Sequence, residues 1–370
     1  MEAQLFKPFP LRGLTLRNRV VVSPMQNYSA PDSVPTAWHR THLARFALGG
    51  AGLVMVEATA ITPDGQSTDR DLGLWSDDQT KALAELVSTV HDCGAPVGLQ
   101  LQHAGRKAHT SPPWEGFAPV DLSTGEEVLG PDGKPASHNG RRPRPMTETD
   151  MDYVVEAYRN ATLRAHLAGV DLIELHMAHG YLLHSFLSPL ANTRNDEFGG
   201  SLEGRMHFPL DIVQAVRSAW PAEKPMACRI SSVDGVGIGW SMEESRVLAG
   251  WLKQAGVDLV DCSSGGMPLP SKEMLLPRQP GFQVPFSAAL RNDIGVATMA
   301  VGLITDPHQA EEVISQGQAD LVAIARQMLV DPNWTVNAAR ALMGPDGFAF
   351  WPRPYGWWLE RRDRSSHIPR

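Results

Sequence analysis

The sequence predicts an α/β fold of the (β/α)8 barrel class, and three observations support this prediction. Short apolar strands recur behind a glycine that ends a helix, as in residues 49–58, 168–175, 255–262 and 317–324. These strands are almost continuously apolar, which is typical of parallel strands buried on both faces. Repetition of one strand–helix unit along 370 residues favours a closed barrel, whose core needs about 250 residues.

Eight strands are expected, and amphipathic helices separate them. In chain order the strands lie around residues 20–23, 53–56, 97–100, 172–175, 226–229, 259–262, 296–299 and 321–324. Several helices carry start signals, either a capping residue or a proline in the first turn. These expected starts are Ser76 or Asp77, residues 147–150, the capping box at 241–244, Pro307 and Pro332.

Two segments exceed the needs of a barrel. One is the long loop after the third strand, residues 103–145, which is rich in proline and glycine and has the length of an active-site lid. We expect Trp114, Phe117 and Val120 to gain by packing. The other is the aromatic-rich tail, which we expect to be irregular, so that residues 1–343 form the barrel and 344–370 the tail. Exposed aromatics at this density usually mark an interface, and the alternative is packing on the chain's own barrel.

Composition and charge exclude several classes of protein. The net charge of -8 argues against nucleic-acid binding, and no apolar run is long enough to span a membrane. The N-terminus lacks a basic region followed by an apolar one, so we expect no secretory signal and a cytoplasmic protein. The three cysteines are scattered, which argues against structural zinc, an iron–sulfur centre and a disulfide framework.

Two imidazoles and a phenol crowd together where the fourth strand ends, at His176, His179 and Tyr181. In this fold the reacting groups project from such strand ends. Imidazole donates hydrogen bonds to an oxygen that gains negative charge, and a phenol donates or takes a proton. The alternatives at this point are a zinc site or a pair of core histidines. Gly180, and the lack of a glutamate between the histidines, argue against a helical zinc-protease motif.

An anion site is expected after the seventh and eighth strands. There Val301-Gly302 and Ala325-Arg326 offer backbone N–H groups and a guanidinium, at the place where barrels commonly bind phosphate. The alternative is that Arg326 pairs with a surface carboxylate.

The remaining strand ends form a polar ring without paired carboxylates, in which Gln100, His176 and Arg229 supply amide, imidazole and guanidinium. This set suits a planar heterocycle with carbonyl edges and does not suit glycoside hydrolysis, which needs two acids. A heterocycle that also carries a phosphate and fills a barrel mouth is most simply a flavin mononucleotide.

Over nearly its whole length the sequence resembles the old yellow enzyme family of FMN-dependent ene-reductases. Six motifs in family order carry the resemblance: Ser-Pro-Met at 23–25, Trp-Ser-Asp at 75–77, and the segments 103–107, 176–181, 186–189 and 196–201. Segments 103–107 and 354–361 are similar to the thermophilic-like, xenobiotic-reductase branch. The resemblance implies a homodimer or higher homo-oligomer in which one subunit's tail reaches the other's active site.

The resemblance also implies the site residues. FMN would be held by Ser23, Pro24, Met25, Gln26, Ala58, Gln100, His176, Arg229, Val301, Gly302, Ala325 and Arg326. Substrate would be bound by Tyr28, His176, His179, Tyr181, Gln26 and Trp358. No metal ligand is implied. A cation at Arg229, beside the flavin N1 and O2, would stabilise the reduced flavin.

The implied reaction transfers hydride from NADPH (or NADH), through the flavin N5, to the β-carbon of an α,β-unsaturated carbonyl compound. His176 and His179 would hold the carbonyl oxygen, and Tyr181 would donate a proton to the α-carbon. Two positions depart from the branch pattern. Gln26 stands where relatives carry a cysteine, so we expect a different flavin potential and substrate range, and Ala325 stands where a glycine is frequent.

Three other functions remain open from the sequence. A barrel flavoenzyme could act on another substrate, as a redox-neutral isomerase or a dienoyl-thioester reductase, although larger dienoyl reductases need cysteines for an iron–sulfur centre. A non-catalytic FMN-binding barrel would not need a proton donor such as Tyr181. A metal-dependent hydrolase using His176 and His179 would need further ligands, where Gln100 and Arg229 stand instead.

Overall fold

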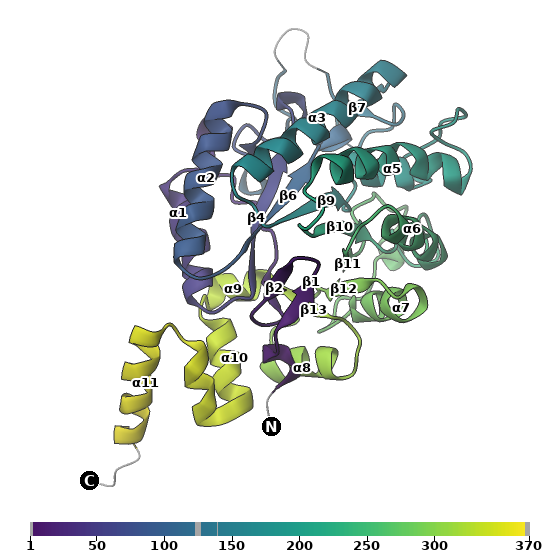
Figure 1. The fold of residues 1–370 in the computed structure, drawn as a ribbon. Coiled ribbons are helices and arrows are strands. Elements are labelled where there is room, and N and C mark those ends of the chain that lie inside the picture. The colour runs from purple at the N-terminus through teal and green to yellow at the C-terminus, as the bar shows by residue number, and fades with distance from the viewer. Residues whose placement is uncertain (1–2, 123–126, 139, 367–370) are drawn as a thin grey trace.

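Eight parallel strands close into a ring in the computed structural model, which describes residues 3–122, 127–138 and 140–366 (Figure 1). The ring consists of β3 (Val20–Val22), β4 (Leu53–Ala60), β6 (Val97–Gln102), β9 (Leu172–Met177), β10 (Met226–Ser231), β11 (Leu259–Ser263), β12 (Ala297–Ala300) and β13 (Leu321–Ile324). Each strand pairs with the next, and β13 pairs with β3 to close the barrel. The predicted fold class and all eight strands are confirmed.

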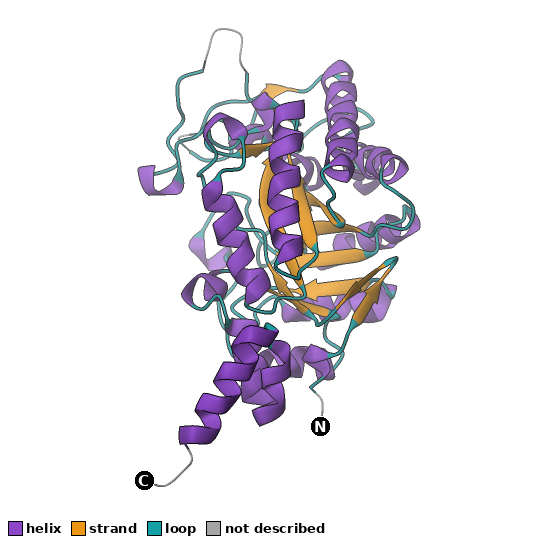
Figure 2. Ribbon diagram, turned by 60° about the vertical axis from the view of Figure 1, so that its left-hand side comes forward, coloured by secondary structure: helices purple, strands orange, loops and turns teal. Residues whose placement is uncertain are grey.

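Helices surround the ring, and the strands lie inside them (Figure 2). The outer helices are α1 (Ala37–Leu48), α2 (Asp77–Asp92), α3 (Glu148–Leu167), α5 (Leu202–Ala219), α6 (Met242–Gln254), α7 (Val284–Ile294), α8 (Pro307–Ser315) and α10 (Trp334–Met343). Two short helices, α4 (Leu182–Leu187) and α9 (Arg326–Val330), follow β9 and β13. Among the described residues, no helix is long and apolar enough to cross a membrane.

The predicted helix starts are confirmed except at α10. Ser76, Thr147 and Ser241 each accept a backbone N–H from the residue three positions later. Asp306 caps α8, with a proline in its first turn. Helix α10 begins two residues later than Pro332 predicts, because the Asp331 carboxylate accepts the Asn333 N–H at 2.9 Å and holds a turn there.

The barrel interior changes from apolar to polar along most of its strands, although inward residues of β12 and β13 such as Met299 and Ala323 stay apolar. At the amino end of the strands, Leu53, Leu172 and Leu259 pack together. An N-terminal hairpin of β1 (Phe9–Leu11) and β2 (Leu14–Leu16), which was not predicted from the sequence, packs against them. Because side chains alternate along a strand, Leu172, Glu174 and His176 all point inward, while their neighbours join the core under the helices. The polar site therefore begins halfway up the barrel and opens at its carboxyl end.

The long loop 103–145 holds short elements, namely η4 (Gly105–Lys107), η5 (Pro113–Glu115), β7 (Leu129–Gly130) and β8 (Arg144–Pro145). The prediction that the apolar side chains of this loop pack is largely wrong, because Trp114, Phe117 and Val120 remain exposed. The Trp114 ring nevertheless meets the Tyr28 ring edge-on, with centroids 5.6 Å apart. This contact brings the loop against the segment that follows β3.

The tail forms helices, so the expectation of an irregular segment is wrong. It contains η7 (Gly344–Phe350) and α11 (Arg353–Ser366), and α11 projects beyond α10 away from the barrel (Figure 1). The Phe350 ring packs on Phe6, with centroids 4.8 Å apart, and Arg340 pairs with Asp363 at 3.1 Å. The expected boundary at residue 343 is the end of α10, and its domain meaning stays a prediction.

Candidate active site

A cavity of about 590 Å³ opens at the carboxyl ends of the later strands. Its lining includes six of the residues predicted to bind cofactor or substrate: His179, Arg229, Val301, Gly302, Ala325 and Arg326. The two predicted strand-end pairs, after β12 and β13, thus lie on one cavity with an imidazole and a guanidinium.

The corner formed by Gly302 and Arg326 has the features of an anion site. Gly302 has φ +120°, and an added Cβ would lie 3.1 Å from Phe282 and Gln283, so the chain closes tightly there without a side chain. Among the ion pairs of the described residues, none involves Arg326, which is exposed at the start of α9. The alternative of a surface carboxylate partner for Arg326 therefore finds no support in the described part of the chain.

Acidic and basic side chains share the middle layer of the barrel. Arg229 lies 3.1 Å from Asp261 and donates from Nη1 to the Ser23 hydroxyl at 3.2 Å, while Gln100 donates to Glu174 at 2.7 Å. Burial raises the pKa of Glu174 to about 8, with a further contribution from Asp261, and burial also raises the pKa of Asp261. The expectation of a polar ring without paired carboxylates is therefore wrong, because Glu174 and Asp261 both lie in this layer.

Sequence reasoning missed the two acids because it considered only the strand ends. Glu174 stands two residues before His176, and Asp261 two residues before Ser263, so each lies one inward position deeper in the barrel. The period of two along a strand would have found both.

His176 and His179 approach each other through their ring nitrogens. His176 lies inside β9, not after it, and its Nε2 is 3.4 Å from Nδ1 of His179. The Tyr181 ring is 4.9 Å from the His176 ring. Burial first, and then the charge of Arg229, lower the pKa of both histidines well below the ordinary value, so both rings are neutral near pH 7. The described residues hold no cluster of His, Cys, Asp or Glu arranged for a metal.

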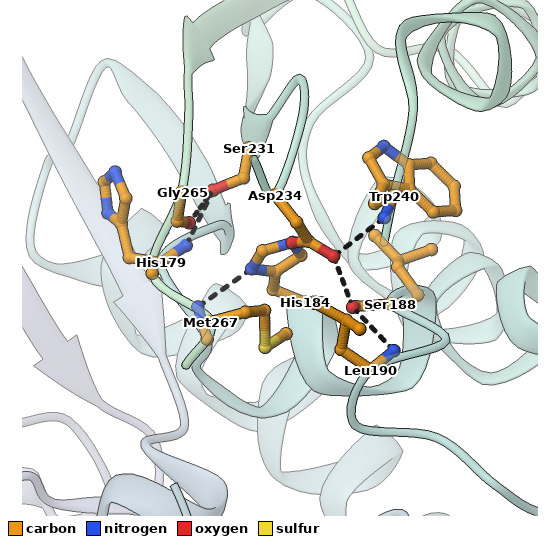
Figure 3. A network of polar contacts seen from close by, with 12 residues as sticks. His179, His184, Ser188, Leu190, Ser231, Asp234, Trp240, Gly265 and Met267 are labelled. Atoms are coloured by element: carbon orange, nitrogen blue, oxygen red, sulfur yellow. Dashed lines mark hydrogen bonds and ion pairs between the residues drawn. The ribbon is translucent and has the colours of Figure 1, made fainter. Parts of the chain in front are cut away.

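A buried hydrogen-bond network holds the turn that carries His179 (Figure 3). His179 and Gly180 both have positive φ, at 60° and 78°. The Gly180 N–H donates to Nδ1 of His184 at 2.8 Å, and Nε2 of His184 lies 3.0 Å from buried Asp234. The His179 N–H donates to Ser231 at 3.0 Å. Sequence reasoning missed His184, Asp234 and Ser231, because nothing in the sequence brings them together.

The segment after β3 is held by hydrogen bonds to Glu57 of β4 and within itself. The buried Glu57 carboxylate accepts both the backbone and side-chain N–H groups of Asn27, and burial raises the pKa of Glu57 to about 8. Asn27 also donates to the Met25 carbonyl at 2.8 Å. The Gln26 amide nitrogen is buried without a partner among the described residues, and its oxygen accepts from Tyr28 at 3.4 Å. Two other predicted residues, Pro24 and Ala58, directly precede Met25 and follow Glu57.

Trp358 is the predicted site residue that lies apart from the others within this chain. It is 67% exposed on α11, and its ring meets Trp357 at 4.5 Å between centroids. Any contact between Trp358 and an active site therefore needs a second subunit.

Fold and site together define a (β/α)8-barrel enzyme with a nucleotide-sized cavity at the face where such barrels carry their chemistry. Residues 4–343 match the model of the NADH:flavin oxidoreductase / NADH oxidase family. The chain belongs to this family of oxidoreductases, the old yellow enzymes that its motifs resemble.

Relatives and solved structures agree with this assignment. The chain is 43% identical over 344 residues to a NADPH dehydrogenase of Geobacillus sp. (strain WCH70), covering 92% of this chain and 95% of the relative. It is 40% identical over 346 residues to a NADPH dehydrogenase of Bacillus subtilis (strain 168), covering 92% and 96%. The structure is similar to morphinone reductase, with a TM-score of 0.77 and 27% identity, covering 93% of this chain and 90% of that one.

Proposed function

We propose that this protein is an FMN-dependent ene-reductase that oxidises NADPH and reduces the C=C bond of α,β-unsaturated carbonyl compounds. The observation that carries the proposal is the approach of His176 Nε2 and His179 Nδ1 to 3.4 Å, beside Tyr181. Of the pair, His179 lies on the wall of the cavity. The names of the Geobacillus and Bacillus relatives support NADPH as the reductant.

The residues present fit FMN at three points. The tight backbone at Gly302 suits a phosphate, and so does Arg326, which has no ion pair with any residue that the structure describes. The Gln26 amide nitrogen, which has no partner within the described ranges, would supply a hydrogen-bond donor for a flavin edge. Arg229, on the cavity lining, would supply positive charge to a bound flavin, and this charge would favour the anionic reduced form. When bound, the flavin would accept hydride from NADPH and pass it to the unsaturated carbon.

Two neutral imidazoles that face each other can hold one acceptor between them. Each neutral ring has a single N–H, and Nδ1 of His176 is buried without a partner in the described residues. The proton of His176 therefore belongs on Nε2, the nitrogen that faces His179. A carbonyl oxygen placed between the rings would receive donated hydrogen bonds, which draw electron density from the β-carbon and stabilise the charge that develops on oxygen.

Tyr181 is suited to donate a proton and not to lose it beforehand. Burial raises the pKa of its phenol to about 12, so the O–H remains in place throughout the ordinary pH range. A general acid of this kind contributes about 100-fold or more to a rate.

A spectroscopic experiment tests the proposal. The purified protein should be yellow, should lose its flavin absorbance on anaerobic addition of NADPH, and should regain it with cyclohexenone or maleimide. Absence of flavin would contradict the whole proposal. Flavin that is bleached by NADPH but not reoxidised by any enone would instead favour the isomerase or dienoyl-thioester alternatives.

A further inference from the structure

We propose that Ser263 is a positioning residue that hydrogen-bonds Nε2 of His179 in either tautomer of the ring, and so lets the histidine pair change from its free arrangement to one that grips a carbonyl oxygen. Ser263 is the last residue of β11 and follows Leu259 and Asp261 on the inward face of the strand. The inference rests on the proposed function of His176 and His179, and it assigns their working tautomers.

The contacts of the pair form a short chain of hydrogen-bonding atoms. Ser263 Oγ lies 2.6 Å from Nε2 of His179, and Nδ1 of His179 lies 3.4 Å from Nε2 of His176. Nδ1 of His176 has no partner in the described part of the protein. Ser263 is only 4% exposed, and it lines the same cavity as His179.

Counting protons along this chain gives two arrangements. In the first, His176 Nε2–H donates to His179 Nδ1, and the remaining proton of His179 is on Nε2, which donates to the Ser263 oxygen. In the second, His179 carries its proton on Nδ1, and Ser263 donates its hydroxyl hydrogen to the bare Nε2. A serine hydroxyl can serve in both, because it is donor and acceptor and rotates freely between the roles.

Only the second arrangement aims two N–H groups at one point. A carbonyl oxygen accepts hydrogen bonds and cannot donate them, so the clamp needs protons on Nε2 of His176 and Nδ1 of His179. Substrate arrival then requires one proton to leave Nε2 of His179 and another to reach Nδ1, by exchange with water at the cavity. The net charge of the ring is unchanged, and Ser263 turns from acceptor to donor.

Among the described residues, Ser263 is the hydroxyl that contacts a ring nitrogen of His179. Ser231, on the neighbouring strand β10, contacts the backbone of His179 instead. It already accepts the backbone N–H of His179 at 3.0 Å and donates to the Gly265 carbonyl at 2.7 Å. Ser231 therefore holds the backbone of the turn, while Ser263 is left to the ring.

Nitrogen NMR tests the inference directly in the FMN-bound protein labelled with 15N-histidine, because long-range 15N–1H correlations distinguish the two tautomers of each ring. His179 is identified by the signal that disappears in His179→Gln. Cyclohexenone, added without NADPH so that no turnover occurs, is the probe with an acceptor-only oxygen.

We expect the free protein to show His179 with its proton on Nε2, and the cyclohexenone complex to show it on Nδ1. Ser263→Ala should remove the hydrogen-bond shift of Nε2 in both the free protein and the complex, and should lower the fraction of His179 that reaches the Nδ1 tautomer with cyclohexenone. Ser263→Thr, which keeps the hydroxyl, should behave as wild type. The matched control is Ser232→Ala, which removes another buried serine hydroxyl that has no described partner.

Two results would overturn the inference: an Nε2 signal and a fraction of the Nδ1 tautomer in Ser263→Ala that both match wild type, or cyclohexenone binding that leaves the His179 tautomer unchanged. A failure of the proposed function is distinguishable from both. In that case cyclohexenone perturbs neither the flavin absorbance nor any histidine signal, while the free-protein spectra of the serine variants still report on Ser263.

Discussion

Gln100 donates a hydrogen bond of 2.7 Å from its amide nitrogen to Oε1 of Glu174, and the two residues are register partners on strands β6 and β9. The contact uses the donor end of the amide, so the Gln100 oxygen is the end left for another partner. It also places a carboxyl group, whose other oxygen is unpartnered among the described residues, in the middle of the barrel.

This burial predicts a pH-dependent stability. Because the folded protein raises the pKa of Glu174 from 4.5 to about 8, it holds that proton more tightly than the unfolded chain. The contribution of Glu174 is constant below pH 4.5 and falls as pH rises toward about 8. Glu174→Gln keeps the acceptor for Gln100 and removes the titration. Between pH 4.5 and about 8, the free energy of unfolding of Glu174→Gln should therefore rise relative to that of wild type, by on the order of 1 kcal/mol per pH unit.

Urea unfolding at several pH values, with FMN held at one saturating concentration, measures this difference. Glu156→Gln on the exposed face of α3 is the control and should show no such trend. A difference between Glu174→Gln and wild type that is independent of pH would contradict the prediction.

Tyr181→Phe should separate the two half-reactions. Loss of the proton donor should slow reoxidation by cyclohexenone about 100-fold or more, and leave flavin reduction by NADPH within a few-fold. Since the pKa of Tyr181 is about 12, wild-type reoxidation should show no loss from ionisation of this phenol below that pH. Stopped-flow absorbance measures both steps, with Tyr153→Phe, which is 54% exposed on α3, as the control. Equal slowing of both steps would speak against a proton-donor role.

Arg326→Ala should weaken FMN binding. A charge-assisted hydrogen bond contributes about 1.5–3 kcal/mol, so the dissociation constant should rise roughly 10- to 100-fold. Arg326→Lys keeps the charge but loses the bidentate geometry of the guanidinium, so its dissociation constant should lie between those of wild type and Arg326→Ala. Flavin fluorescence titration of the FMN-free protein measures the constants. Arg246→Ala, which removes a surface ion pair with Asp293, is the control; an Arg326→Ala protein that binds as tightly as this control would exclude the phosphate role.

Gln26→Cys should lower the flavin potential and change the range of enones reduced. The buried amide nitrogen of Gln26 can donate to the flavin, and a hydrogen bond of about 1 kcal/mol to the reduced form corresponds to about 20 mV for two electrons. Gln26→Met removes the amide without adding a thiol and should show the same drop. Redox titration and a panel of enones are the measurements. If Gln26→Cys leaves both the potential and the substrate profile unchanged, the hypothesis fails.

A chain that ends at Gly344 should lose its assembly and handle substrate differently. It removes α11 with its exposed Tyr355, Trp357 and Trp358, which we propose to contact a second subunit. Sedimentation velocity should show a shift from dimer to monomer, and the KM for enones should rise. Trp358→Ala in the full chain should change the KM while the dimer persists. Normal sedimentation and kinetics in the shortened chain would count against the proposed interface.

The sequence by itself determined the barrel. Apolar strands, glycine stops and capping residues such as Ser76 and Ser241 act over a few residues, so their pattern is legible without the fold. The residues after the strands, such as Gly302 and Arg326, could be assigned to one cavity because parallel strands of a barrel all end at the same face. The start of α10 was misplaced because the Asp331 turn competes with a helix there.

Only the tertiary structure decided which side chains meet inside. Glu174 and Gln100 are 74 residues apart in the chain, and Ser263 and His179 are 84 apart. Such pairs depend on strand register and on the conformation of one turn, which no local pattern encodes. The formation of α11 in the tail likewise depends on tertiary contacts with α10, such as the pair between Arg340 and Asp363. The sequence could therefore specify the chemical groups of the site, whereas their tautomers, charges and contacts follow from packing.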